Sequence, residues 1–273
     1  MRTKLKGYRL IEFKRPITHV KYNLDCDLFL ASSKAKNIYS WRGDAFEPLN
    51  SYEGHKGSIN DFCIQDDSKL IISASADNSL MIFDTETAAV INKLTEKGPF
   101  THCGISLSRQ MFFYIYVSGI DSYSLNVREL NGDITLIFQK EGKGLPTCAM
   151  WGYLDEQIII GLENGQLIIF DLCTKNIKPI QAHKSSISDI QMSRDYMHFI
   201  TCSTDSTVLF WDASTYNYNK YETNVNLNSV SLSPFKDYVF IFVSISLFVL
   251  AGFPRVRLHK QKQTQPIFSS MIY

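Results

Sequence analysis

The stretch from Ala182 to Asp212, AHKSSISDIQMSRDYMHFITCSTDSTVLFWD, decides the fold of this chain. It begins with a small residue followed by His, continues through three short runs rich in β-branched and aromatic residues, and ends in Trp211-Asp212. Runs of this kind, separated by polar turns, are typical of antiparallel strands. We therefore expect strands over 187–192, 198–202 and 207–211, followed by an outer strand over 218–222.

The same type of ending recurs along the chain at a nearly constant interval of about 41 to 44 residues. The five endings are Trp41-Arg42, Phe83-Asp84, Val127-Arg128, Phe170-Asp171 and Trp211-Asp212. A period of about 40 to 45 residues closed by an aromatic-Asp pair is typical of a four-stranded propeller blade. The expected fold class is therefore an all-β propeller. This fold favours a role in binding partner proteins over a catalytic role.

Polar residues recur at fixed places within the period. A polar residue stands in the turn between the two middle strands of four units, as Asp77, Asp121, Asn164 and Asp205, with Ala35 as the exception. An imidazole, a turn carboxylate, a strand hydroxyl and an indole N–H can satisfy one another where water cannot reach. We expect such a polar clamp in two units, the second with His55, Ser73 and Asp77, and the fifth with His183, Thr201, Asp205 and Trp211.

A group of His, Asp and Ser or Thr also has the composition of a hydrolase triad. The trio recurs here in register with the repeat, and a catalytic site has no reason to repeat. A buried polar clamp does, because each unpaired polar group in a core costs about 1 to 3 kcal/mol. No phosphate-binding loop and no cluster of metal ligands is visible in the sequence. We therefore expect no enzymatic activity, no cofactor and no metal.

Composition narrows the class of protein further. The 28 Lys and Arg residues nearly balance the 27 Asp and Glu residues, so the near-neutral net charge does not indicate direct nucleic-acid binding. The six cysteines form no C-x-x-C pair and read as small buried strand residues of a reducing compartment. The N-terminus does not resemble a signal peptide. We expect a cytoplasmic protein.

Further stretches resemble the subunit I family of eukaryotic translation initiation factor 3, in register from about Leu10 to Phe242. They are residues 52–55, 75–79, 101–104, 149–152 and, above all, 188–195. The resemblance implies a seven-bladed WD40 propeller without catalytic activity, held in the factor by its b and g subunits. Such a subunit would act as a scaffold that helps the 40S ribosomal subunit to load and scan messenger RNA.

The resemblance also implies a partner-binding region. In the family, the b subunit packs a helix against the side of the propeller near the fifth and sixth blades, which corresponds to 220–228 here. The candidate contact residues are Lys220, Tyr221, Glu222 and Asn224, although the family pattern has an acidic residue where Asn224 stands. The alternative is that 220–228 is only a solvated outer strand and loop.

Three departures from the family pattern concern the first and third blades. Ala35 replaces the turn Asp of the first blade, and Arg42 and Arg128 replace the final Asp of their units. We expect weaker polar clamps in these two blades.

The pattern divides the chain into a propeller, 1–242, and a tail, 243–273. The blades end near 42, 84, 128, 171 and 212, and a partial sixth blade occupies 225–242. The uncharged run over 238–253 is shorter than the roughly 20 residues of a membrane-spanning helix, and its composition favours a strand or an aggregation-prone segment. One hypothesis is that a retained intron encodes the tail. The alternative is a membrane-associated WD40 adaptor in signalling, whose tail places basic residues against the membrane.

Overall fold

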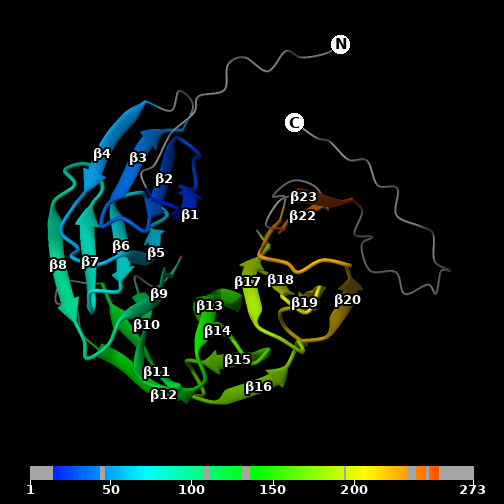
Figure 1. The fold of residues 1–273 in the computed structure, drawn as a ribbon. Coiled ribbons are helices and arrows are strands. Elements are labelled where there is room, and N and C mark those ends of the chain that lie inside the picture. The colour runs from blue at the N-terminus through cyan, green and yellow to red at the C-terminus, as the bar shows by residue number, and fades with distance from the viewer. Residues whose placement is uncertain are drawn as a thin grey trace, which may run out of the picture. The chain divides into compact units, whose positions relative to one another are not determined.

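The computed structural model describes residues 15–43, 47–106, 111–130, 136–193, 195–232, 238–243 and 246–251. The described residues form strands β1 to β23 and one short 3-10 helix, η1 (Tyr153–Asp155). The strands pair in antiparallel sheets with their neighbours in chain order (Figure 1). The predicted all-β class, with five four-stranded blades and part of a sixth, is confirmed.

By its internal contacts the chain divides into two units, Met1–Trp151 and Gly152–Tyr273. The first unit holds three complete sheets. Their strands are β1 (Ile17–Tyr22), β2 (Leu28–Ser33), β3 (Ile38–Arg42), β4 (Pro48–Tyr52), β5 (Ile59–Ile64), β6 (Leu70–Ser75), β7 (Ser79–Asp84), β8 (Val90–Thr95), β9 (Phe100–Ile105), β10 (Met111–Gly119), β11 (Ser122–Glu129) and β12 (Leu136–Lys143). The division falls within the fourth blade, after its first strand, β13 (Pro146–Trp151).

The second unit holds the rest of the fourth blade, the fifth blade and the sixth sheet. Its strands are β14 (Gln157–Leu162), β15 (Gln166–Asp171), β16 (Ile177–Gln181), β17 (Ile187–Met192), β18 (His198–Ser203), β19 (Thr207–Asp212), β20 (Tyr218–Glu222), β21 (Ser229–Leu232), β22 (Tyr238–Val243) and β23 (Ser246–Ala251). The four strands predicted for the fifth blade are confirmed, and β18 and β19 each extend one residue further.

Continuously buried runs of the middle strands build the core of each unit. The central runs of β6, β7, β10 and β11 are buried on both faces, as expected for strands between two packed sheets. One apolar cluster joins the second and third sheets, where Ile72 and Ile82 pack with Phe100 and Tyr114. In the second unit, Ile200 and Val208 pack with Leu227 and Val230, which connects the fifth blade to β21.

The sixth sheet continues past the predicted boundary at residue 242. Phe242 pairs with Leu247 and Val243 with Ser246, so β23 extends the sheet by a third strand. The boundary at 242 lies where the family resemblance ends. Strand pairing depends instead on the residues of the segment, which are uncharged and rich in β-branched side chains. In the part of the chain that the structure describes, no helix is long and apolar enough to cross a membrane.

The expectation that the cysteines are buried strand residues is partly wrong. Cys63, Cys103, Cys148 and Cys202 are buried, but Cys26 and Cys173 are exposed. Both exposed cysteines lie in turns that follow β1 and β15, where no second sheet covers them. None of the six forms a disulfide.

Candidate functional site

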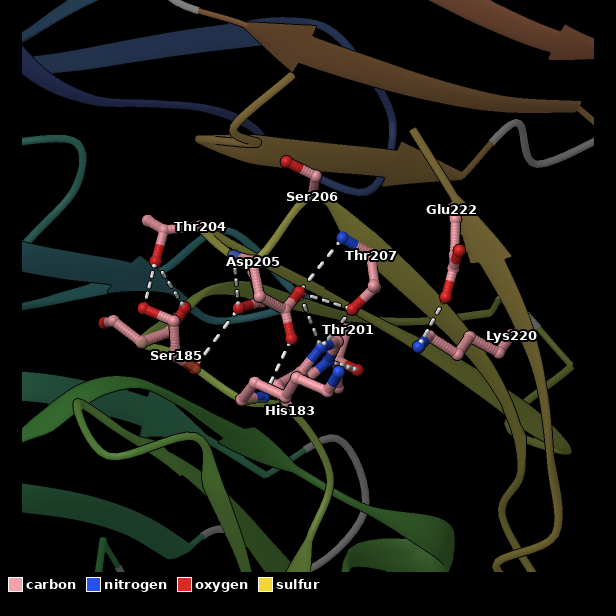
Figure 2. Close-up of polar contacts among 12 residues, drawn as sticks. His183, Ser185, Thr201, Thr204, Asp205, Ser206, Thr207, Lys220 and Glu222 are labelled. Atoms are coloured by element: carbon pink, nitrogen blue, oxygen red, sulfur yellow. Dashed lines mark hydrogen bonds and ion pairs between the residues drawn. The ribbon is translucent and has the colours of Figure 1, made fainter. Parts of the chain in front are cut away.

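The fifth blade brings its four predicted clamp residues together. Figure 2 labels His183, Thr201 and Asp205 among them. His183 lies in the loop before β17, and its imidazole reaches the middle of the blade. The Nε2 atom of His183 lies 2.7 Å from Thr201 Oγ1 on β18. The Nε1–H of Trp211 on β19 donates to the same hydroxyl oxygen at 3.0 Å. Thr201 therefore accepts from the indole and donates to the imidazole.

The turn between β18 and β19 supplies the other end of this chain of hydrogen bonds. His183 Nδ1 lies 2.7 Å from Thr207 Oγ1 and 3.5 Å from Asp205 Oδ1. The Thr207 hydroxyl donates to Asp205 Oδ1 at 2.5 Å, and the Lys184 amide donates to Oδ2 at 2.7 Å. This order of donors and acceptors assigns the imidazole proton to Nδ1.

The second blade repeats the arrangement. His55 Nε2 lies 2.7 Å from Ser73 Oγ, and Nδ1 lies 3.1 Å from both Asp77 Oδ2 and Ser79 Oγ. The ring of Phe83 takes the place of the indole and meets the imidazole edge-on, with centroids 6.5 Å apart. Ser73 thus lacks the indole donor that Thr201 has, as the sequence predicts.

Sequence reasoning missed two members of the clamp, Ser79 and Thr207. Each follows its turn carboxylate by two residues and hydrogen-bonds to both the carboxylate and the imidazole. The residues in between, Asn78 and Ser206, have φ angles of 61° and 67°, which closes the hairpin tightly enough for this contact. The shared pattern Asp-x-Ser/Thr was the available signal.

Burial sets the protonation states of these groups. Burial lowers the pKa of His55 and of His183, and the nearby carboxylates Asp77 and Asp205 only partly offset it. Burial alone raises the pKa of Asp77, but hydrogen bonds from Ser79 and from the Lys56 amide hold that pKa well below its ordinary value. At neutral pH each clamp therefore joins a neutral imidazole to a carboxylate.

The clamp side chains are largely buried and already bonded to one another, which does not favour a role in hydrolysis. His55, Ser73, His183 and Thr201 are almost completely buried, and the hydroxyls of Ser73 and Thr201 already bond to the imidazoles. The arrangement can satisfy buried polar groups and hold the strands of one blade in register. Within the described residues, no group of three or more His, Cys, Asp or Glu side chains could hold a metal ion.

The third blade has its own polar network in place of the clamp. The Nε–H of Arg128 donates to the Tyr114 hydroxyl, which donates to Glu96, with both distances at 2.9 Å. Arg128 Nη2 also lies 3.8 Å from Glu96 Oε1. The expectation of a weaker clamp in this blade overlooked these contacts, because Glu96 lies on the connector from the second blade. In the first blade, Arg42 Nη1 lies 3.9 Å from Oε2 of the exposed Glu47.

The candidate partner-binding residues separate into two groups. Lys220 and Glu222 are exposed on β20, with Nζ and Oε1 2.7 Å apart (Figure 2). Tyr221, between them, points the other way and packs against the cluster of Ile200, Val208 and Leu227. Asn224 is exposed on the connector that leads to β21. The structure thus presents a charged pair and an amide on the surface, held from beneath by Tyr221.

Comparison with known proteins agrees with the fold. The family model "WD domain, G-beta repeat" matches residues 46–84 and 174–212, which end at the second and fifth strand endings. The WD40 class of the fold is thereby confirmed.

The relatives carry the name expected from the resemblance. Eukaryotic translation initiation factor 3 subunit I of Xenopus laevis is 34% identical over 239 residues, which are 83% of this chain and 72% of that protein. The protein of the same name from Homo sapiens is 31% identical over 248 residues, covering 86% of this chain and 75% of that protein. With identity at this level across most of both proteins, the chain belongs to the eukaryotic translation initiation factor 3 subunit I family.

Proposed function

We propose that this chain is a non-catalytic scaffold subunit of eukaryotic translation initiation factor 3. It would bind subunits b and g in the cytoplasm and, through them, support recruitment of messenger RNA to the 40S ribosomal subunit and scanning. The observation that carries the proposal is the family relationship, at 34% identity over 83% of the chain. The alternative of a membrane-associated adaptor gains no support from the relatives found.

The outer strand β20 and the connector 223–228 form the proposed surface for subunit b. The exposed Lys220 and Glu222 offer one charge of each sign, and the connector adds Asn224. Their mutual hydrogen bond raises the pKa of Lys220 and lowers that of Glu222, so both stay charged at neutral pH. Charges at the rim of an interface contribute chiefly to orientation and association rate.

The polar clamps have a structural role in this proposal. The clamps would fix the middle strands of their blades. Their members are His55, Ser73 and Asp77 in the second blade, and His183, Thr201, Asp205 and Trp211 in the fifth. The repeated His, Asp and hydroxyl groups would thus stabilise the blades, including the fifth blade, whose outer strand is β20.

Co-purification tests the proposed function. A tagged chain expressed with subunits b and g of the same organism should retain both through affinity and size-exclusion steps. The double variant Lys220→Ala, Glu222→Ala should retain less b subunit, whereas Lys93→Ala on the outer strand β8 should retain as much as the wild type. Failure of the wild-type chain to retain either subunit would contradict the proposal.

A further inference from the structure

Two innermost strands, β5 and β17, carry a carboxylate at the same structural position. The pairing of β5 with β6 shifts between Ile59 and Asp61, and that of β17 with β18 shifts between Ile187 and Asp189. Such a bulge re-aims the side chain that follows it. In both blades the re-aimed carboxylate points to the inner strand of the next sheet, about 40 residues along the chain.

Asp61 shows the contact in the first unit. Its Oδ1 accepts from the amide of Phe62 at 2.8 Å, and its Oδ2 accepts from the amide of Cys103 on β9 at 3.2 Å. Lys21 of β1 donates to Oδ1 at 3.2 Å. One carboxylate therefore joins the inner strands of three successive blades.

Asp189 makes the equivalent contact in the second unit. Its Oδ1 accepts from the amide of Ile190 at 2.9 Å. Its Oδ2 accepts from the Ser229 hydroxyl at 2.5 Å and from the Val230 amide on β21 at 3.1 Å. The Val230 amide lies on the edge of β21 that no described strand of its own sheet covers, so the carboxylate supplies the acceptor that this amide requires.

The segment between β20 and β21 is held at its start, near its middle and at its end. At its start, the amide and the hydroxyl of Thr223 both donate to the Ser206 carbonyl, at 2.8 and 2.9 Å. Near its middle, the side chain of Leu227 is fully buried in the apolar cluster. At its end, Asp189 holds Ser229 and Val230. Asn224 and the other exposed connector residues lie between these anchors.

We propose that Asp189 is a positioning residue for partner binding: it fixes the end of the connector 223–228 and thereby the conformation that subunit b meets. The inference rests on the proposed function, because the connector belongs to the proposed surface for subunit b. Asp189 does not itself need to touch the partner. Without its carboxylate, Ser229 and the Val230 amide lose this acceptor at the end of the connector, while the contacts of Thr223 and Asn226 with Ser206 and the burial of Leu227 remain.

The experiment combines hydrogen exchange with affinity measurement. Asp189→Asn keeps the size of the side chain and removes its charge, and Ser229→Ala removes only the hydroxyl that the carboxylate holds. Asp61→Asn is the matched control, because it likewise replaces one of the two acceptor oxygens at the equivalent contact in the other unit. Amide exchange is followed over 223–232, and the affinity for purified subunit b of the same organism is measured by titration.

We expect Asp189→Asn to speed exchange over 223–232 and to weaken subunit b binding by about tenfold, or about 1.4 kcal/mol. Ser229→Ala should also speed exchange and weaken binding, but by less than Asp189→Asn does. Asp61→Asn should leave both unchanged even where it lowers the melting temperature. Unchanged exchange in Asp189→Asn, or faster exchange with full affinity, would overturn the proposal. If the wild-type chain does not bind subunit b, the proposed function is wrong, and exchange alone decides whether Asp189 holds the connector.

Discussion

At the scale of single residues, the His183 side chain links the two middle strands of the fifth blade. Its two ring nitrogens join a hydroxyl on β18 to a hydroxyl on β19, and through the second one it reaches Asp205. All of these groups lie where water cannot replace a lost partner. A change at His183 therefore leaves several polar atoms unsatisfied at once.

We expect His183→Ala to lower the free energy of unfolding by about 1 to 3 kcal/mol, the usual effect of leaving buried polar groups unpaired. Chemical denaturation of the purified protein measures the change. Thr201→Val removes the hydroxyl that bonds to the imidazole, so the double variant should lose less than the sum of the two single changes. Strict additivity would contradict the proposed clamp.

The two clamps also predict a pH dependence of stability. Because burial lowers the pKa of His55 and His183 below 6.5, the unfolded chain takes up protons at a higher pH than the folded chain does. Their contribution is complete above pH 6.5 and is lost as the pH falls below it. Urea unfolding between pH 7.5 and 5 should show this decline.

His183→Gln, which cannot titrate, provides the comparison for this pH dependence. The variant should be less stable at pH 7.5 and should lose less stability on acidification than the wild type. Equal slopes in the two proteins would exclude His183 as a source. Asp77 contributes to stability in a separate pH range. Because the folded structure lowers its pKa, this contribution is complete above pH 3.8 and is lost as the pH falls below that value.

At the scale of the element, the third blade shows how one blade replaces a missing clamp. Arg128 stands at a strand ending where three other blades have Asp after Trp or Phe, and it lies against Tyr114 and Glu96. Only 19% of the Arg128 side chain and 22% of the Glu96 side chain are exposed. The equivalent pair in the first blade, Arg42 and Glu47, is 57% and 60% exposed.

This difference in burial predicts different effects of the same substitution. Arg128→Asp should lower the free energy of unfolding by about 1 to 3 kcal/mol, because it removes the donor to Tyr114 and places a second carboxylate near Glu96. Arg42→Asp should change it by about 0 to 1 kcal/mol, as is usual for exposed pairs. Thermal and chemical denaturation of both variants test this. Equal losses in the two variants would show that the buried network adds nothing.

At the scale of the whole molecule, the two units carry different parts of the proposed role. The first unit contains the clamp of the second blade and the Asp61 contact. The second unit contains the complete fifth-blade clamp, β20 and the connector. The proposed surface for subunit b therefore lies entirely within residues 152–273.

A scaffold subunit of the initiation factor should travel with its complex. We expect the tagged chain, expressed in cells of its own organism, to sediment with the small ribosomal subunit in a sucrose gradient. Lys220→Ala combined with Glu222→Ala should move part of it to the top of the gradient, whereas Lys93→Ala should not. A wild-type chain found only in free fractions would contradict a role in the assembled factor.

The sequence by itself determined the period of the blades, the strands of the fifth blade and the members of each clamp that share a fixed place in the repeat. These features are local, because strand alternation and turn chemistry act over a few residues. The tertiary structure decided which other groups meet them. Thr207 completes a clamp, Arg128 reaches Glu96 on another blade's connector, and Asp189 reaches β21. The last two contacts join residues far apart in the chain, whose encounter depends on how neighbouring sheets pack.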